Sequence, residues 1–444
     1  MDRKGFLKIG LATLGCKANH SDAASLTAEL AAQGHRFTSF HQPADVYIIH
    51  TCTVTQKADF QSRQLIRRAI ARNPDAQIIV TGCYAQVAPD VVRTVPGVDF
   101  IVGMGERQKI PEIIASGKKH GQACVLSSSM EERRPWEDER LPLFFARTRA
   151  YLKVQDGCDG FCSYCIVPFA RGRSRSLPLQ DALTKAGELA RKGVKEIVLT
   201  GIHLGGYGAD LIPHRSLLDL LQALEKDIPP LRIRLSSIEP REIPLPLIDF
   251  LAQSSRVCPH LHIPLQSGDD GILQRMNRDY SAAFFADLVT RLTGSLPDLA
   301  IGVDVIVGFP GEDEKAFENS LRLLETLPIS YLHAFPFSRR KGTAAASFSG
   351  AVPSAVIKAR CQSLRELGAK KRSVFCSSFK GKKAQVLVES KRDSESGQLR
   401  GYSRNYIPVL LPGGDEFINH ELDVEITEVR GAKVFGKVLG DLCG

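Results

Sequence analysis

The sequence predicts an α/β protein with an N-terminal parallel-sheet domain, a partial (β/α)6 barrel and a small C-terminal β-barrel. Over the first two parts, apolar runs of strand length alternate with helical stretches, which is the pattern of parallel βα units. Residues 119–144 interrupt this pattern with a charged, irregular stretch. From residue 375 onward, apolar and polar side chains alternate at period two between glycine-rich turns, as in small antiparallel barrels.

These changes of pattern divide the 444 residues into four parts. They are an N-terminal domain (1–118), a linker (119–144), a barrel core (145–374) and a terminal barrel (375–444). The composition, 43% hydrophobic and 24% charged, is that of an ordinary globular protein. No apolar stretch approaches the length of a membrane span, and Lys8 interrupts the apolar run near the N-terminus. We therefore expect a cytoplasmic protein that has no secretory signal and binds no membrane.

The N-terminal domain is expected to contain strands and helices in regular alternation. Gly34 is a helix stop signal, and the second helix is basic and amphipathic. The expected strands are 6–15, 45–50, 77–82 and 99–103, and the expected helices are 21–33 and 56–72.

Three cysteines of this domain stand just beyond expected strand ends. Cys16 follows the first strand, Cys52 the second and Cys83 the third. The carboxyl ends of parallel strands meet at one edge of a sheet, where ligands bind. The alternative is that each cysteine is a small buried hydrophobic residue. Three cysteines in matching positions favour a three-thiolate metal site.

The barrel core is expected to contain six βα units, fewer than the eight of a closed barrel, so it should be open on one side. Its expected strands are 150–154, 196–200, 232–237, 260–265, 301–307 and 330–335, with helices such as 179–191 and 313–325 between them. A helix over 353–376 leads to the terminal barrel, whose expected strands are 383–389, 401–411 and 422–429.

A second cysteine cluster, Cys158, Cys162 and Cys165, follows the first barrel strand with the spacing Cys-x3-Cys-x2-Cys. Four thiolates would close a zinc site or an iron–sulfur cubane, whereas three leave one metal without a protein ligand. The closest downstream histidine is His203, which disfavours a zinc knuckle. The odd total of 11 cysteines argues for reduced thiols that act as ligands. We therefore expect a four-iron cluster with one open iron.

This cysteine spacing resembles that of the radical S-adenosylmethionine (SAM) enzymes. Nearly the whole chain resembles the methylthiotransferases of that superfamily. Those proteins combine a three-cysteine domain, a radical SAM core and a TRAM domain, which is an OB-like RNA-binding barrel. Four stretches resemble the branch that acts on N6-threonylcarbamoyladenosine in tRNA. They are 13–19 (TLGCKAN), 51–55 (TCTVT), 62–68 (SRQLIRR) and 335–343 (FPFSRRKGT). His50, where that branch usually has Asn, and residues 20–22 depart from its pattern.

The resemblance implies an enzyme that uses SAM and two 4Fe–4S clusters. It would convert N6-threonylcarbamoyladenosine, 3′ of the anticodon, to its 2-methylthio derivative by radical chemistry. The implied catalytic and metal-binding residues are Cys158, Cys162 and Cys165 for the SAM cluster, and Cys16, Cys52 and Cys83 for an auxiliary cluster. Two alternatives within the family are isopentenyladenosine in tRNA and an aspartate of a ribosomal protein. A two-cluster electron-transfer protein with an RNA-binding tail is the alternative from another class.

The family places SAM-binding groups beside the cluster and at the ends of barrel strands. The corresponding residues here are Tyr164, Gly201, Glu239, His262, Gln266 and Gly308. Each has a plainer interpretation as well, because a lone tyrosine is often a core residue and a glycine turn can simply connect a strand to a helix.

The net charge of +9 suggests a polyanionic partner, which the resemblance identifies as tRNA. Phosphate contacts would position the RNA, and its target base would be splayed out of the loop. The candidate contacts are Arg63, Arg67, Arg68, Arg171, Arg173, Arg175, Arg339, Arg340, Lys341, Lys380, Lys382 and Lys383. The alternatives are that a basic run is only a solvated face, and that one of the arginines at 171, 173 and 175 serves SAM or the cluster instead. We also expect an electron donor, a sulfur donor and a monomeric chain. Five cysteines fit neither cluster, and we expect most of them to be inert core residues or spare surface thiols: Cys124, Cys258, Cys361, Cys376 and Cys443.

Overall fold

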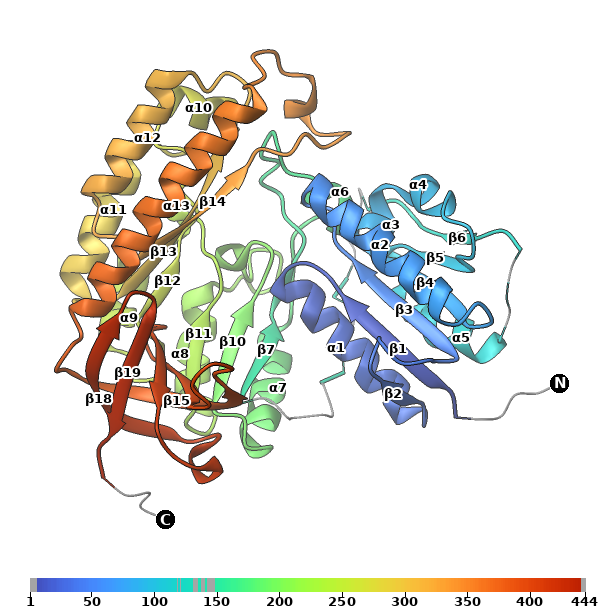
Figure 1. Ribbon diagram of the computed structural model, residues 1–444, viewed down its shortest axis with the longest axis horizontal. Helices are drawn as coiled ribbons and strands as arrows, with labels where there is room; N and C mark the ends of the chain where they lie inside the picture. The colour runs from blue at the N-terminus through green and yellow to red at the C-terminus, as the bar shows by residue number, and fades with distance from the viewer. Residues whose placement is uncertain are drawn as a thin grey trace. The chain divides into compact units, whose positions relative to one another are not determined.

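The computed structural model describes residues 6–117, 119, 121–130, 135–136, 140–141 and 148–440 (Figure 1). The chain forms two compact units. Unit 1 comprises Met1–Phe144, Gln155–Leu177 and Ser338–Ser347, and unit 2 comprises Phe145–Val154, Pro178–Phe337 and Phe348–Gly444. Most of the charged linker expected over residues 119–144 lies outside the described residues. Among the described residues, no helix is both long and apolar enough to cross a membrane.

Unit 1 is built on a six-stranded sheet of order β2-β1-β3-β4-β5-β6, in which every neighbouring pair is parallel. The central strands β3 and β4 are buried along their whole length, as expected for a parallel sheet covered on both faces. The short strands β2 and β6 had no expected counterpart in the sequence. The strands are β1 (Lys8–Thr13), β2 (Arg36–Thr38), β3 (Val46–Thr51), β4 (Gln77–Gly82), β5 (Phe100–Val102) and β6 (Cys124–Leu126).

Helices cover both faces of this sheet, because successive side chains of a strand point to opposite faces. Ile48 packs in one core cluster with Leu30 of α1, and its neighbour Ile49 packs in another with Ile66 of α2. Helix α1 begins at Lys17, directly after Cys16 and earlier than the sequence predicted. The helices are α1 (Lys17–Ala32), α2 (Gln56–Arg72), α3 (Cys83–Val87), α4 (Pro89–Arg93), η1 (Met104–Lys109) and α5 (Ile110–Ser116).

A second segment of the chain, Gln155–Leu177, belongs to the same unit. Its short strands β8 (Gln155–Asp156) and β9 (Arg175–Ser176) pair antiparallel. Between them lie the Cys158–Cys165 loop and helix α6 (Val167–Arg171). A third segment, Ser338–Ser347, ends in the short helix η4 (Ala344–Ser347).

Unit 2 contains the six parallel strands that the sequence predicted for a partial barrel. They form two three-stranded sheets, β11-β10-β7 and β12-β13-β14. Parallel bridges from Ile233 to Val257 and from Ser237 to His262 join the two sheets. The strands are β7 (Arg149–Lys153), β10 (Glu196–Thr200), β11 (Arg232–Leu235), β12 (His260–His262), β13 (Ala300–Val307) and β14 (Tyr331–Pro336).

Helices connect the strands of this partial barrel. Ser216 and Asp219 form a capping box at the start of α8, and Asp313 caps α12 through the backbone N–H of Ala316. The connecting helices are α7 (Leu179–Arg191), η2 (Leu204–Gly206), α8 (Leu217–Asp227), η3 (Pro240–Glu242), α9 (Leu245–Gln253), α10 (Asp270–Arg275), α11 (Ala282–Ser295) and α12 (Glu314–Thr326).

The C-terminal part of unit 2 is a closed barrel of order β15-β16-β17-β19-β18, which follows helix α13 (Ser354–Ser377). Its core is aliphatic, with Val386, Val409 and Val424 fully buried. The predicted architecture of a parallel-sheet domain, a six-unit partial barrel and a small β-barrel is therefore confirmed. The remaining elements are β15 (Lys383–Arg392), β16 (Leu399–Ser403), β17 (Pro408–Leu411), η5 (Asp415–Phe417), β18 (Glu421–Arg430) and β19 (Lys433–Val438).

Candidate functional site

The first three cysteines lie at one edge of the unit 1 sheet. Cys16 is the N-terminal cap of α1, Cys52 directly follows β3, and Cys83 is the first residue of α3 after β4. Strands β1, β3 and β4 are neighbours in the sheet and run parallel. The three thiols therefore leave the sheet at the same, carboxyl edge.

Asn19 shows how closely these cysteines converge. Its side-chain oxygen lies 3.9 Å from Cys16 Sγ and 3.8 Å from Cys83 Sγ. Its amide nitrogen donates hydrogen bonds to the carbonyl oxygens of Leu14 (2.7 Å) and Thr51 (3.0 Å). Through these two hydrogen bonds, the Asn19 side chain connects the strand ends that precede Cys16 and Cys52.

The backbone before Cys16 requires glycine. Gly15 has φ +105°, and a Cβ at this position would lie 2.8 Å from the Cβ and 3.0 Å from the Sγ of Cys52. The absent side chain allows the chain carrying Cys16 to approach Cys52 closely.

Burial keeps two of the three thiols protonated in the metal-free chain. It raises the pKa of Cys83 to about 12 and raises the pKa of Cys52, while the charge of Arg171 opposes both shifts. Cys16 is exposed. A metal that binds here must displace the thiol protons, as is usual for cysteine ligands.

Arg171 links this cysteine set to the second one within unit 1. Its side chain is fully buried (0% exposed) and donates to Asp156 Oδ1 (2.8 Å), Asp22 Oδ2 (2.7 Å) and Asn19 Oδ1 (2.5 Å). Arg107 pairs with the other oxygen of Asp22 at 2.9 Å. Helix α1, which Cys16 caps at its N-terminus, is therefore tied to the strand and the helix that flank the Cys158 loop.

Cys158, Cys162 and Cys165 are half-buried on the loop between β8 and α6. The backbone N–H of Gly160 donates to Cys158 Sγ at 3.3 Å. Gly157 has φ +74°, and a Cβ there would lie 2.0 Å from the carbonyl oxygen of Arg173, so only glycine fits this turn. Three accessible thiols on one loop, with a backbone N–H directed at sulfur, suit an iron–sulfur cluster.

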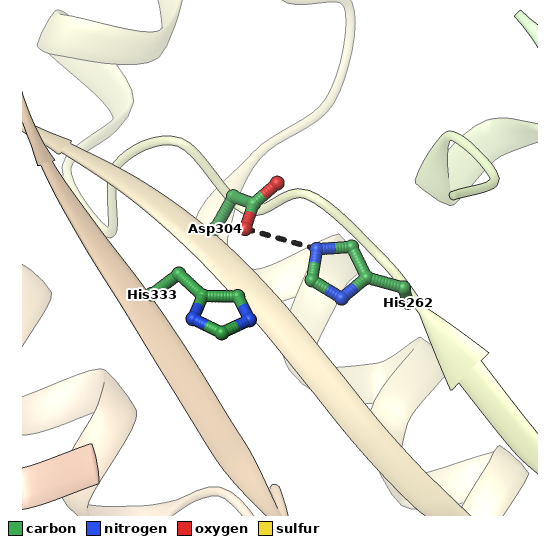
Figure 2. A group of neighbouring side chains, drawn as sticks. All are labelled: His262, Asp304 and His333. Atoms are coloured by element: carbon green, nitrogen blue, oxygen red, sulfur yellow. Dashed lines mark ion pairs between the residues drawn. The ribbon is translucent and has the colours of Figure 1, made fainter. Parts of the chain in front are cut away.

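Two of the predicted SAM-binding residues, Glu239 and His262, carry ionisable side chains and belong to unit 2. Glu239 forms an ion pair with Arg278, and burial raises the pKa of its carboxyl group despite that partner. His262 Nε2 lies 2.9 Å from Asp304 Oδ1, with His333 beside them (Figure 2). Sequence reasoning missed Asp304 and His333, because only the strand register brings them to His262.

The other predicted SAM contacts occupy strand ends or the cysteine loop. Gly201 directly follows β10, and Tyr164 lies between Cys162 and Cys165. Gln266 has φ +65° and its backbone N–H donates to the Asp304 carbonyl oxygen at 2.8 Å. Gly308 has φ +79°, and a Cβ there would lie 2.4 Å from Ile357. Their assignment to SAM remains a prediction.

The predicted RNA contacts separate into buried and exposed groups. Arg171 and Arg175 are buried and share Asp156, and buried Arg340 donates to Asp59 Oδ2 at 2.7 Å. These guanidinium groups stabilise unit 1 from within, which argues against direct phosphate contact. Arg63 is partly buried and donates to Tyr84 Oη at 2.6 Å. The exposed candidates are Arg67, Arg68, Arg173, Arg339, Lys341, Lys380, Lys382 and Lys383.

An exposed aromatic pair beside the cysteine loop was not foreseen. Phe161 and Phe169 are 41% and 47% exposed, and their ring centroids are 6.0 Å apart. The guanidinium group of Arg173 lies 5.2 Å from the Phe161 ring. Their signal in the sequence was weak, because phenylalanine near a buried motif is usually a core residue. Unpaired bases of RNA commonly stack on such rings.

The remaining cysteines show no common site among the described residues. Cys258, Cys361 and Cys376 are buried, and Cys124 lies on edge strand β6. Cys443 lies outside the described residues.

Known proteins show the same order of parts. Family models described as "Uncharacterized protein family UPF0004", "Radical SAM superfamily" and "TRAM domain" match residues 8–103, 152–324 and 377–439. The fold is similar to that of a radical S-adenosylmethionine methyltransferase, TsrM, from Kitasatospora setae, with TM-score 0.57 and 15% identity over 77% of each chain.

Matches of this kind, together with the partial barrel and the cysteine loop, define a radical SAM protein with a TRAM domain. "Threonylcarbamoyladenosine tRNA methylthiotransferase MtaB" of Bacillus subtilis is 40% identical, covering 93% of this chain and 92% of the relative. The Thermotoga maritima protein of the same name is 37% identical, covering 97% and 98%. A Clostridium botulinum "tRNA-2-methylthio-N(6)-dimethylallyladenosine synthase" is 31% identical, covering 96% and 95%. The chain belongs to the radical SAM methylthiotransferase family, in its MtaB branch.

Proposed function

We infer that this chain is a tRNA methylthiotransferase that acts on N6-threonylcarbamoyladenosine 3′ of the anticodon. Similarity to MtaB proteins along nearly the whole chain supports this substrate. The structural observation that carries the chemistry is the presence of two three-cysteine sets in one compact unit, joined by the buried Arg171 network. An electron-transfer protein would have little use for two sets that each lack a fourth protein ligand.

The cofactors of the family are SAM and two 4Fe–4S clusters. We propose that Cys158, Cys162 and Cys165 hold the cluster that binds SAM, and that the auxiliary cluster is held by Cys16, Cys52 and Cys83. When bound, these groups supply reductive cleavage of SAM and the sulfur that is transferred.

The protein's own residues supply position and surroundings. Asn19 and Arg171 hold the auxiliary thiols in place through hydrogen bonds to backbone and carboxylate groups. Burial of Cys52 and Cys83 excludes water from that side of the site. The half-buried Cys158 loop stays accessible to a second molecule such as SAM.

The TRAM domain and the names of the relatives support tRNA as the partner. We propose that exposed arginines and lysines, such as Arg67 and Arg68 of α2, contact its phosphates. The adenosine must leave its base stack to reach the thiols, and the exposed rings of Phe161 and Phe169 offer a surface for a neighbouring base. We also propose that the enzyme depends on an electron donor and a sulfur donor, and that it is a monomer.

Nucleoside mass spectrometry of tRNA, from cells that express this chain in place of their own enzyme, tests the function. The unmodified chain should restore 2-methylthio-N6-threonylcarbamoyladenosine. A Cys162→Ala variant should lose both this product and 5′-deoxyadenosine formation in vitro. A Cys52→Ala variant should still cleave SAM but yield product only at background level, because the proposed auxiliary ligands do not take part in cleavage.

A Cys124→Ala variant is the matched control, since Cys124 lies on an edge strand outside both sets, and it should keep both activities. Product formation by Cys52→Ala would contradict the auxiliary site. A 2-methylthio derivative of isopentenyladenosine, with none of threonylcarbamoyladenosine, would instead assign this chain the activity named for the Clostridium botulinum relative.

A further inference from the structure

Unit 2, which contains none of the six proposed cluster cysteines, brings two histidines and an aspartate together. His262 ends β12, Asp304 lies in β13 and His333 lies in β14, which are neighbouring parallel strands. In the strand register, Asp304 of β13 lies opposite His333 of β14. His262 lies opposite Gly302, which is two residues before Asp304 and therefore on the same face of β13. Figure 2 shows the three side chains pointing toward one another. One ligand atom from each lies within 4.8 Å of the others.

A neighbouring tyrosine fixes the orientation of His262. The Tyr331 ring fills the space above Gly302, where a Cβ would lie 2.2 Å from it. The Tyr331 hydroxyl lies 3.4 Å from His262 Nδ1 and 2.7 Å from His260 Nε2. The other nitrogen, His262 Nε2, therefore faces Asp304 Oδ1 at 2.9 Å. Metal-binding histidines are typically held in this way, with one nitrogen engaged by a hydrogen-bonding partner.

The donor set suits a particular class of ion. Imidazole and carboxylate ligands together favour first-row divalent metals such as Zn²⁺, Fe²⁺ or Mn²⁺, whereas Mg²⁺ and Ca²⁺ favour oxygen donors alone. The side chains of His262 and Asp304 are 14% and 26% exposed, and His333 is exposed. Three protein ligands that solvent can reach leave coordination positions open for a further ligand.

We propose that His262, Asp304 and His333 bind one divalent transition-metal ion, in addition to the cysteine-held clusters. His262 then has no nitrogen left for SAM, because Tyr331 engages one and the metal takes the other. This inference goes beyond the proposed function and does not rest on it, since ion binding is measured without SAM or tRNA.

Electron paramagnetic resonance with Mn²⁺ as the probe tests the site on the full chain with both clusters reconstituted. Oxidised 4Fe–4S clusters are diamagnetic, so the six-line signal of free Mn²⁺ reports binding directly. We expect about one Mn²⁺ per chain, released by an equal amount of Zn²⁺, which binds such ligands more tightly. His333→Gln and Asp304→Asn should each weaken Mn²⁺ binding about tenfold or more.

The exposed residue His420, in the terminal barrel, provides the control His420→Gln, which should bind Mn²⁺ as the unmodified chain does. His333 is exposed, so His333→Gln leaves the core intact, and far-ultraviolet circular dichroism verifies its fold. Two results would overturn the proposal. One is no Mn²⁺ binding by the unmodified chain, which would leave His262 and Asp304 as a hydrogen-bonded pair only. The other is equal binding by the unmodified chain and both site variants.

Discussion

Arg171 places a guanidinium group in the interior of unit 1, between carboxylates from two distant segments of the chain. Asp22 belongs to α1 and Asp156 to β8, and both are themselves buried. A buried cation is tolerated only when its partners are well placed, and removing Arg171 leaves Asp22 with Arg107 and Asp156 with Arg175 as the remaining cationic partners described above. The charge of Arg171 also lowers the pKa values of Cys52 and Cys83 against the effect of burial.

Replacing Arg171 by methionine should destabilise unit 1 strongly. Two buried carboxylates would lose their shared partner, which typically costs about 3–5 kcal/mol. Chemical denaturation of the cluster-free chain, followed by circular dichroism, measures this loss. Arg173→Met is the matched control, because Arg173 is exposed and pairs with an exposed Asp159. Equal stability of Arg171→Met and Arg173→Met would show that the network does not hold this unit together.

At the scale of elements, Glu196 of β10 organises one end of the partial barrel. It accepts hydrogen bonds from Arg234 at 2.8 Å and 2.9 Å and pairs with Arg232 at 3.0 Å, both on the neighbouring strand β11. Arg234 in turn donates to the carbonyl oxygen of Arg404 at 2.9 Å, just beyond β16 of the terminal barrel. One carboxylate thus supports both the strand pair and its junction with the terminal barrel.

Glu196→Gln should lower the stability of unit 2 in a pH-dependent way. Burial alone would raise the pKa of Glu196, but Arg234, Arg232 and Arg149 outweigh it and lower the pKa from 4.5 to about 2. Since the folded-state pKa is depressed, the stabilisation of about 3 kcal/mol is complete above pH 4.5 and is lost as the pH falls through 2.

Denaturant unfolding between pH 7 and pH 2, followed by circular dichroism, measures this dependence. The Glu196→Gln curve should be flatter over the acid range than that of the unmodified chain. Glu318→Gln, at an exposed position of α12, is the control and should leave the curve unchanged. Parallel curves for Glu196→Gln and the unmodified chain would rule out the proposed role of the carboxylate.

Sequence periodicity predicted the major elements well, because each is a local pattern of apolar residues. It also predicted that Cys16, Cys52 and Cys83 share a sheet edge, since strand ends in a parallel sheet must coincide. It did not predict the group around His262, because strand register depends on packing that no local pattern encodes. For the same reason no local pattern shows that Arg171 is buried, since its partner Asp22 lies 149 residues away.

At the scale of the whole molecule, the excess of positive charge can attract RNA phosphates only where lysine and arginine side chains are exposed. Lys380, Lys382 and Lys383 are exposed where α13 enters the terminal barrel, and the TRAM match covers them. Lys382 lies 4.0 Å from one carboxylate, that of Asp298, whereas Lys433 of the same barrel is paired with Glu395 and also lies 3.9 Å from Asp393. A lysine that is already paired with two carboxylates attracts a phosphate group less strongly.

Replacing Lys380, Lys382 and Lys383 together by glutamine should therefore weaken tRNA binding and also reduce its salt dependence. Each lost phosphate contact lowers the slope of log K against log salt by about 0.7–0.9, so three contacts lower it by about two to three. Fluorescence anisotropy with labelled tRNA over a salt series measures this slope. Lys433→Gln should change it little, because that ammonium group is already neutralised. An unchanged slope in the triple variant would show that RNA phosphates do not contact this face, and the exposed arginines of unit 1 would then carry the charge recognition.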